Sequence, residues 1–281
     1  MRKYKEKIMQ AVFLLTACVS IAAVALICIY LLGSGIPTIL KIGPANFFGK
    51  VWKPSKNLFG ILPMIVGSIY VTAGAILIGV PIGLLCAIYL SRFCPKPIYR
   101  VLKPAVELMA GIPSIVYGFF GLMVIVPVIQ KLSGTSGKSL LTASILLGIM
   151  ILPTIISVAE SSLNAVPNSY YEGSLALGAT HERSVFSAVL PAAKSGVMSG
   201  VVLGVGRAIG ETMAVIMIAG NQAIMPSGLL KGLRTMTANI VLEMGYASGL
   251  HREALIATGV VLFVFILIIN TCFSLLKRRN G

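Results

Sequence analysis

Six long apolar stretches constrain the fold of this chain more than any other feature. Each is close to the about 20 residues that an α-helix needs to cross the hydrocarbon core of a membrane. They cover residues 8–32, 64–90, 108–129, 140–158, 196–219 and 254–276. A soluble domain typically carries about a quarter charged residues, whereas charged residues make up 11% of this chain. The pattern therefore predicts an all-α integral membrane protein with six transmembrane helices. The first stretch is too long for a signal peptide and is expected to remain as a helix.

The distribution of lysine and arginine predicts how these helices are oriented. Basic residues outnumber acidic ones by 23 to 8, and they flank the apolar stretches, which favours a membrane protein over a nucleic-acid partner. Both tails are basic, so both termini are expected in the cytoplasm. Four lysines in residues 33–63 weaken this contrast, because that loop should lie outside. Three units are expected: a first helix with its external loop (1–63), a core of five helices (64–276) and a basic cytoplasmic tail (277–281).

Residues 159–195 form the longest expected cytoplasmic loop, and their sequence predicts two short helices. Gly178 is suited to end the first helix, and Thr180 can cap the second. Pro191 is expected to break the chain before the next span. Helix–glycine–helix hairpins are common, so the pattern alone leaves open whether this loop docks a partner or only turns the chain.

The stretch 196–219 carries two charges inside an apolar helix. On a helical wheel of about 100° per residue, Arg207 and Glu211 share a face with three glycines spaced every fourth residue. These are Gly196, Gly200 and Gly204, and small residues at this spacing let helices pack closely. A charge at mid-membrane depth costs on the order of 3 kcal/mol and faces a bundle interior or a wet cavity.

Two interpretations of these charges stay open. In the first, Arg207 and Glu211 form an i,i+4 ion pair that only joins helices. In the second they line a gate or binding site, where the planar guanidinium suits an oxyanion such as phosphate. A neighbouring glutamate could then accept a hydrogen bond from an oxygen of the ligand that still carries a proton. Such an oxygen distinguishes hydrogen phosphate from sulfate.

Two prolines interrupt apolar stretches. Pro113 lies in the third stretch and Pro153 near the end of the fourth. Each removes one backbone hydrogen bond from a membrane helix. Ordinary kinks and hinges around a central path fit this pattern equally well.

The chain shows no constellation of residues typical of an enzyme. It contains no aspartate, and its two histidines, His181 and His251, are both expected at the surface. Its five cysteines form no CxxC pair, so neither a zinc site nor a disulfide framework is indicated. We therefore expect no metal and no catalytic residue on this chain.

The loop around Gly178 resembles the EAA loop of importer-type ABC transporter permeases. That pattern reads E-A-A, three residues, G, nine residues, I-x-L-P, and this chain matches it at Glu172, Gly178, Leu190 and Pro191. It departs where Gly173 and Ser174 replace the alanines and Ala188 replaces the isoleucine. The resemblance implies a cytoplasmic coupling helix, at about residues 170–188, that fits a cleft in an ATP-binding subunit. The coupling residues it implies are Tyr171, Glu172, Gly178, Ala179, Leu190 and Pro191.

Two further strings resemble phosphate-specific ABC permeases of the PstC type. Residues 206–215 read GRAIGETMAV, and residues 111–118 read GIPSIVYG. The resemblance extends over about residues 57–276. It implies the type I ABC importer permease fold in a bacterial plasma (inner) membrane. It also implies that Arg207, Glu211 and Thr212 lie on the substrate path.

The same resemblance implies a complete transport system. The chain would form half of the translocation path of an ATP-driven, high-affinity phosphate importer that works by alternating access. The implied partners are a second permease subunit of the PstA type, a homodimeric ATP-binding subunit that holds ATP and Mg²⁺, an extracytoplasmic phosphate-binding protein and membrane lipid. No cofactor on this chain and no nucleic acid are implied. Three alternatives remain: a permease for molybdate or sulfate, the other phosphate permease subunit, and a self-contained secondary transporter.

Overall fold

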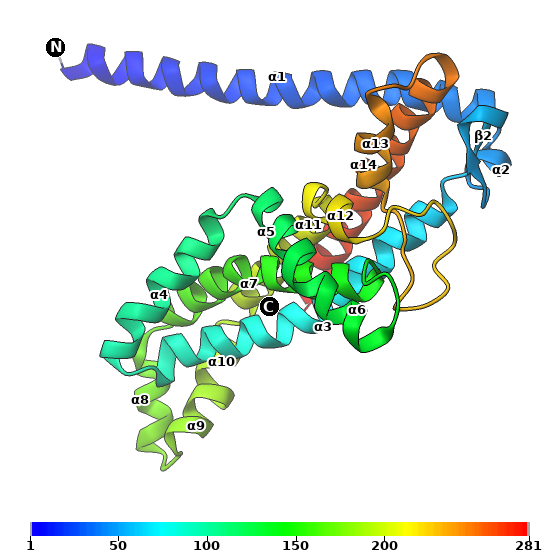
Figure 1. Ribbon diagram of the computed structural model, residues 1–281. Helices are drawn as coiled ribbons and strands as arrows, with labels where there is room; N and C mark the ends of the chain where they lie inside the picture. The colour runs from blue at the N-terminus through cyan, green and yellow to red at the C-terminus, as the bar shows by residue number, and fades with distance from the viewer. Residues whose placement is uncertain (1, 280–281) are drawn as a thin grey trace.

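The computed structural model describes the backbone of residues 2–279 and the side chains of residues 6–272 and 275. Figure 1 shows a bundle of helices with one long helix, α1, set apart from it. Within the described residues, five helices are long and apolar enough to cross a membrane, or six if one bent pair counts as a span. The five are Glu6–Ile42, Leu62–Phe93, Ser114–Ser133, Leu140–Asn164 and Gly249–Cys272, and the bent pair is His181–Ala192 with Lys194–Gly210. The predicted all-α membrane fold is confirmed, and the two helices of the bent pair meet at 72°.

The first helix, α1 (Arg2–Ile42), is longer than predicted and almost unburied. The sequence predicted a loop from residue 33, whereas the helix continues to Ile42 with Pro37 inside it. The reason is a close crossing with α14 (Gly249–Arg279): a Cβ at Gly35 would collide with the side chain of Val260. Packing on α14 thus holds the C-terminal part of α1 helical, while the rest extends away from the bundle (Figure 1).

A small structure follows α1 at what the sequence predicts to be the outer end. It consists of α2 (Pro44–Phe47), β1 (Trp52–Lys53), the 3₁₀ turn η1 (Pro54–Lys56) and β2 (Leu58–Phe59). The strands pair antiparallel, with Trp52 opposite Phe59. Both aromatic side chains are buried in one cluster with residues of α13 (Met236–Met244) and α14. This apolar contact orders the segment against the end of the bundle.

The core of the bundle is built around α7 (Leu140–Asn164), which packs between α3 and α11. Helix α3 spans Leu62–Ile88 and continues as a π-helical turn, η2 (Tyr89–Phe93). Helix α11 spans Lys194–Gly210. Glycines make the α3–α7 contact close: a Cβ at Gly79 would lie 2.7 Å from the carbonyl oxygen of Gly148. In a membrane, where the hydrophobic effect does not drive helices together, such close van der Waals contact is a main source of association.

The third span begins later than the sequence predicted. Helix α4 (Lys96–Gly111) ends before Pro113, and the span then runs through α5 (Ser114–Phe120), the π-helical turn η3 (Gly121–Ile125) and α6 (Val126–Ser133). Residues 108–111 therefore belong to α4. Pro113 marks a true break, because the residue before a proline is driven out of the helical region. Pro153, in contrast, lies inside an unbroken α7.

The loop after α7 forms short helices at the opposite end of the molecule from the hairpin of β1 and β2 (Figure 1). They are α8 (Asn168–Ala176), α9 (His181–Ser184), the π-helical turn η4 (Val185–Val189) and α10 (Leu190–Ala192). Thr180 caps α9 by accepting from the backbone N–H of Arg183, as predicted. The predicted break before the next span is present, but it lies at Ala193, two residues after Pro191, where His181–Ala192 and Lys194–Gly210 meet at 72°.

The predicted division at residues 63 and 276 stays a prediction. Helix α14 continues to Arg279, so the backbone of the basic tail is partly helical. Residues 280 and 281, and the side chains of residues 276–279, lie outside the described residues.

Candidate functional site

The two charges predicted on one continuous helix lie at a helix break. Helix α11 ends at Gly210, and α12 (Met213–Ile218) starts after Glu211 and Thr212. The prediction of a continuous helix over 196–219 is therefore wrong. The physical reason is Glu211 itself, whose Oε1 accepts from the backbone N–H of Thr212 (3.1 Å) and Ala214 (3.2 Å). These donors have no intrahelical partner, so a carboxylate beside them stabilises a new helix start.

Arg207 lies in the last turn of α11 and reaches α7. Its side chain is half-buried, and Nη1 donates to Oγ1 of Thr154 at 3.2 Å. Thr154 lies near the middle of α7, so the guanidinium lies near mid-membrane depth if α7 crosses the bilayer from end to end. Among the described side chains, no ion pair joins Arg207 to Glu211. Their i,i+4 pairing is lost because Glu211 turns to α12.

The two strings that resembled phosphate permeases meet at this break. Helix α5, which carries one of them, packs on α12, which carries the other. A Cβ at Gly118 would lie 2.9 Å from Cα of Ala214, so this glycine allows the two backbones to approach. The hydroxyl of Tyr117 donates to the carbonyl oxygen of Met109 at 2.8 Å and so bridges the α4–α5 break.

Thr212 and Thr237 complete the surroundings of the break. The Thr212 hydroxyl donates to the carbonyl oxygen of Gly210 at 3.1 Å. The Thr237 hydroxyl, from α13, donates to the carbonyl oxygen of Glu211 at 3.1 Å. Sequence reasoning did not identify Thr154, Tyr117 or Thr237, because each comes from another helix and none carries a charge.

The three glycines of α11 face α7. A Cβ at Gly196 would collide with the side chain of Ser162, and at Gly204 it would lie 2.8 Å from Cγ1 of Ile155. At Gly200 it would lie 3.2 Å from Cβ of Val158. This close approach brings the base of Arg207 against α7, where its hydrogen bond to Thr154 forms.

The segment 170–188 presents an apolar tip. Leu177, at the end of α8, is 91% exposed, and Gly178 after it has a φ of 84°. A residue with a side chain is strained at such a positive φ, so glycine is suited to the turn between α8 and α9, and the prediction that it ends α8 is confirmed. Glu172 is exposed on α8, and the backbone N–H of Ala179 donates to the carbonyl oxygen of Ser174 at 3.2 Å.

The base of this segment is fixed to the bundle. The hydroxyl of Tyr171 and Nδ1 of His181 lie 2.8 Å apart in a hydrogen bond, and the ring centroids of His181 and Phe93 are 4.6 Å apart. The expectation of a surface histidine is therefore wrong for His181. Leu190 packs against an apolar cluster under the loop, whereas Pro191 is exposed.

A buried glutamate at the hairpin end was missed by the sequence analysis. Glu243 of α13 accepts from Nη1 of Arg234 (2.6 Å) and Nε1 of Trp52 (2.9 Å). His251 Nε2 lies 2.8 Å from the same carboxylate, so the expectation that this histidine lies at the surface is also wrong. Arg234 additionally donates to the side chain of Asn239.

A second buried glutamate lies towards the other end of the molecule. Glu160, near the end of α7, is 2% exposed. It accepts from the hydroxyl of Tyr99 (2.8 Å) and from Nζ of Lys103 (2.7 Å), both on α4. The hydrogen bond to Glu160 raises the pKa of Tyr99 above its ordinary value.

Metal chemistry finds no support among the described residues, where no group of three or more His, Cys, Asp or Glu side chains could hold an ion. The cofactor prediction is not tested by this and stays a prediction.

Comparisons with known proteins agree with one another. Residues 79–280 match the family model described as "Binding-protein-dependent transport system inner membrane component". A "Probable ABC transporter permease protein YqgH" of Bacillus subtilis (strain 168) is 41% identical, over 92% of this chain and 88% of the relative. A "Phosphate transport system permease protein PstC" of Xylella fastidiosa (strain 9a5c) is 35% identical, over 95% of this chain and 91% of the relative.

Solved structures agree on the fold. A chain of a bacterial alginate ABC transporter, in complex with alginate pentasaccharide-bound periplasmic protein, superposes with a TM-score of 0.67 at 16% identity, covering 97% of this chain and 96% of that one. A chain of the MetNI methionine ABC transporter, in an inward-facing conformation, gives a TM-score of 0.63 at 21% identity, covering 82% of this chain and 100% of that one. The chain therefore belongs to the family of binding-protein-dependent transport system inner membrane components, and it is a multi-pass permease subunit of an ABC importer.

Proposed function

We propose that this permease carries inorganic phosphate into the cell, and that Arg207 stands on its path. The observation that carries the proposal is that most hydrogen-bond donors of the Arg207 guanidinium have no partner among the described residues. The guanidinium makes one hydrogen bond to the described residues, at Nη1 to Thr154. A guanidinium has five N–H donors in a fixed fork, so most of its donors remain available. The fork matches the oxygens of a tetrahedral oxyanion.

Glu211 supports a preference for a protonated oxyanion. Its Oε1 is occupied by the backbone N–H groups at the start of α12, whereas its Oε2 makes no hydrogen bond to the described residues. An ionised carboxylate oxygen is an acceptor only. It can therefore accept the proton of hydrogen phosphate and would repel sulfate, which carries none. The relatives named as phosphate permeases support the same substrate.

The break at residues 211–212 supports transport by alternating access. It lies beside the α5–α12 contact, where the short helix α12 is joined to α11 by two residues. Short joints of this kind absorb the backbone rotations of a conformational change. We infer that ATP binding and hydrolysis on a homodimeric partner drive this change.

The exposed tip of α8 supports docking of that ATP-binding partner. Leu177 and Leu175 are apolar and exposed, in a segment that lies beyond the membrane-spanning helices. An exposed apolar patch of this kind marks a protein contact. The remaining partners of the proposal are a second permease subunit and an extracytoplasmic phosphate-binding protein, with both termini of this chain in the cytoplasm. The cytoplasmic position of the termini rests on their basic residues.

Phosphate uptake by Arg207 variants tests the proposal. Proteoliposomes with the complete importer are given labelled phosphate and ATP. Arg207→Gln is expected to lower uptake by at least about tenfold, because a hydrogen bond to a charged group contributes about 1.5 to 3 kcal/mol. Uptake by Arg207→Lys should lie between that of the wild type and that of Arg207→Gln, since lysine keeps the positive charge and loses the planar set of five donors.

The matched control is Arg100→Gln, an exposed arginine of α4 far from the break along the chain. It should leave uptake unchanged. Normal uptake by Arg207→Gln would remove this residue from the path. Uptake of sulfate or molybdate as fast as phosphate would favour the other oxyanions, and uptake by the purified chain without an ATPase would favour a secondary transporter.

A further inference from the structure

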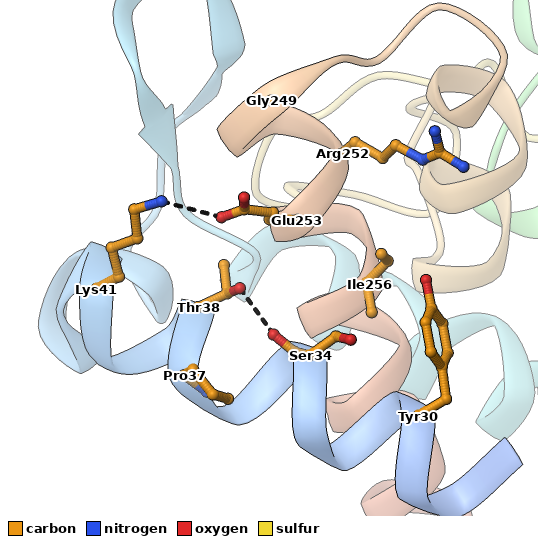
Figure 2. Close-up of a pocket in the computed structure, with 9 residues that line it drawn as sticks. All are labelled: Tyr30, Ser34, Pro37, Thr38, Lys41, Gly249, Arg252, Glu253 and Ile256. Carbon is orange, nitrogen blue, oxygen red and sulfur yellow. Dashed lines mark hydrogen bonds and ion pairs between the residues drawn. The ribbon is translucent and has the colours of Figure 1, made fainter. Parts of the chain in front are cut away.

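A cavity of about 600 Å³ lies between α1 and α14, outside the site described above. It is lined by Tyr30, Ser34, Pro37, Thr38 and Lys41 of α1 and by Gly249, Arg252, Glu253 and Ile256 of α14. Its volume falls within the range of ligand pockets. Figure 2 shows these residues on the two neighbouring helices, with Lys41 of α1 reaching Glu253 of α14.

The apolar runs of the two helices indicate that the cavity lies at the depth of the lipid headgroups. The apolar run of α1 ends at Leu32, and the cavity residues Ser34 and Lys41 follow it on the same helix. On α14, Arg252 and Glu253 come directly before the apolar run that begins at residue 254. Tyr30 and Ile256 lie within these runs and the other lining residues lie outside them, so the cavity is at the edge of the about 30 Å hydrocarbon core.

The charges of the cavity favour an anion. Lys41 pairs with Glu253 at 3.2 Å, and these two charges offset each other. Arg252 makes no hydrogen bond or ion pair to the described residues. In Figure 2 its guanidinium extends on the side of the cavity away from the Lys41–Glu253 pair. The lining thus carries one uncompensated positive charge with a free guanidinium fork.

Two neutral donors accompany this arginine. The hydroxyls of Tyr30 and Ser34 make no hydrogen bond to the described residues. Thr38 donates to the backbone carbonyl oxygen of Ser34 and does not involve the Ser34 hydroxyl. A guanidinium with two hydroxyls is a donor set suited to a phosphate group. Below the cavity, α1 exposes a continuous apolar surface that includes Ile27 and Leu26. Such a surface suits acyl chains.

We propose that this cavity binds the headgroup of one anionic phospholipid, whose phosphate is held by Arg252 and whose acyl chains lie along α1. The location at headgroup depth and the adjoining apolar surface favour a lipid over free phosphate. The net positive lining favours phosphatidylglycerol over a zwitterionic lipid, whose ammonium would face Arg252 or Lys41. The site is distinct from the proposed phosphate path at Arg207, which lies near mid-membrane depth.

Native mass spectrometry of the delipidated importer complex, titrated with dioleoylphosphatidylglycerol, tests this proposal. The wild type is expected to bind one more lipid than Arg252→Ala at low lipid concentration. The site's affinity should fall about tenfold in that variant, from the loss of hydrogen bonds to a charged group. Glu253→Gln should bind more tightly, because it removes the acid of the cavity and releases Lys41.

Three controls make the result decisive. Lys56→Gln removes an exposed lysine of the hairpin end that does not line the cavity, and it should bind lipid as the wild type does. Dioleoylphosphatidylcholine should bind about tenfold more weakly, and millimolar inorganic phosphate should not displace the lipid. Equal binding by the wild type and Arg252→Ala would overturn the proposal. So would equal binding of both lipids, or displacement by inorganic phosphate. Arg252 is exposed and unpaired, so its replacement should leave the melting temperature unchanged.

Discussion

Two buried glutamates, Glu243 of α13 and Glu160 of α7, are held in different ways. Glu243, at the hairpin end, is bound by Trp52 of β1, by Arg234 of a loop and by His251 of α14. Glu160, towards the end that carries α8, is bound by Tyr99 and Lys103, both on α4. The first carboxylate therefore joins four elements, whereas the second joins two.

The cations at the two sites also differ. Arg234 is 17% exposed and has one carboxylate partner, Glu243. Lys103 is 21% exposed and also approaches Glu107 at 3.7 Å. If its carboxylate is lost, Lys103 still has Glu107 within reach, whereas Arg234 has no second carboxylate among the described residues and keeps only its neutral partners Asn221 and Asn239. The hairpin end is thus fixed as one unit, and α4 is attached to α7 by a contact that can be exchanged.

Replacing Glu243 should have the largest effect. Glu243→Ala leaves Arg234 uncompensated, and removing one member of a buried ion pair costs about 3 to 5 kcal/mol. The melting temperature of the purified protein should fall clearly, and limited proteolysis should cut first near the hairpin. The melting temperature of Glu243→Gln should fall less, because glutamine keeps the size of the side chain. A melting temperature equal to that of the Glu160 variant below would contradict the comparison.

Replacing Glu160 should cost less. Glu160→Ala removes two hydrogen bonds, but both donors stay on the partly exposed helix α4, so we expect about 1 to 3 kcal/mol. The matched control is Glu107→Ala, which removes the other carboxylate near Lys103. That carboxylate is 59% exposed, and exposed ion pairs contribute about 0 to 1 kcal/mol. If the control lowered the melting temperature as much as Glu160→Ala, burial would not be what distinguishes these carboxylates.

Replacing Tyr99 should give the smallest effect, together with a pH signature. Tyr99→Phe removes one hydrogen bond, so about 1 kcal/mol is expected at neutral pH. The pKa of Tyr99 is raised in the folded protein, mainly by its hydrogen bond to Glu160. Its contribution to stability is therefore complete below the ordinary pKa of tyrosine and is lost as the pH rises through the higher folded value. Melting temperatures measured from pH 8 to pH 11 should converge for the two proteins at the alkaline end. A constant difference across this range would show that the Tyr99 proton is not involved.

The sequence predicted the fold class because membrane-length apolar runs leave few other structures. It also predicted the turn at Gly178 and the cap at Thr180, since both are local. The helix break at Glu211 was missed because a helical wheel assumes a continuous helix, and the alternative partner of Glu211 was the backbone after it. The glutamate clusters were missed for a different reason. Trp52 and Glu243 are 191 residues apart, and Lys103 and Glu160 are 57 apart, so nothing in the neighbouring sequence indicates either pair.

The long helix α1 has a consequence for how the chain is made. Among the described residues its main packing partner is α14, which follows about two hundred residues later. At a synthesis rate of 5 to 20 residues per second, α14 emerges about 10 to 40 s after α1. During that interval α1 has no partner from its own chain, and lipid or another protein must cover it. Biogenesis thus closes the bundle last at the α1–α14 crossing, so a chain cut short before α14 would leave its first span unattached in the bilayer.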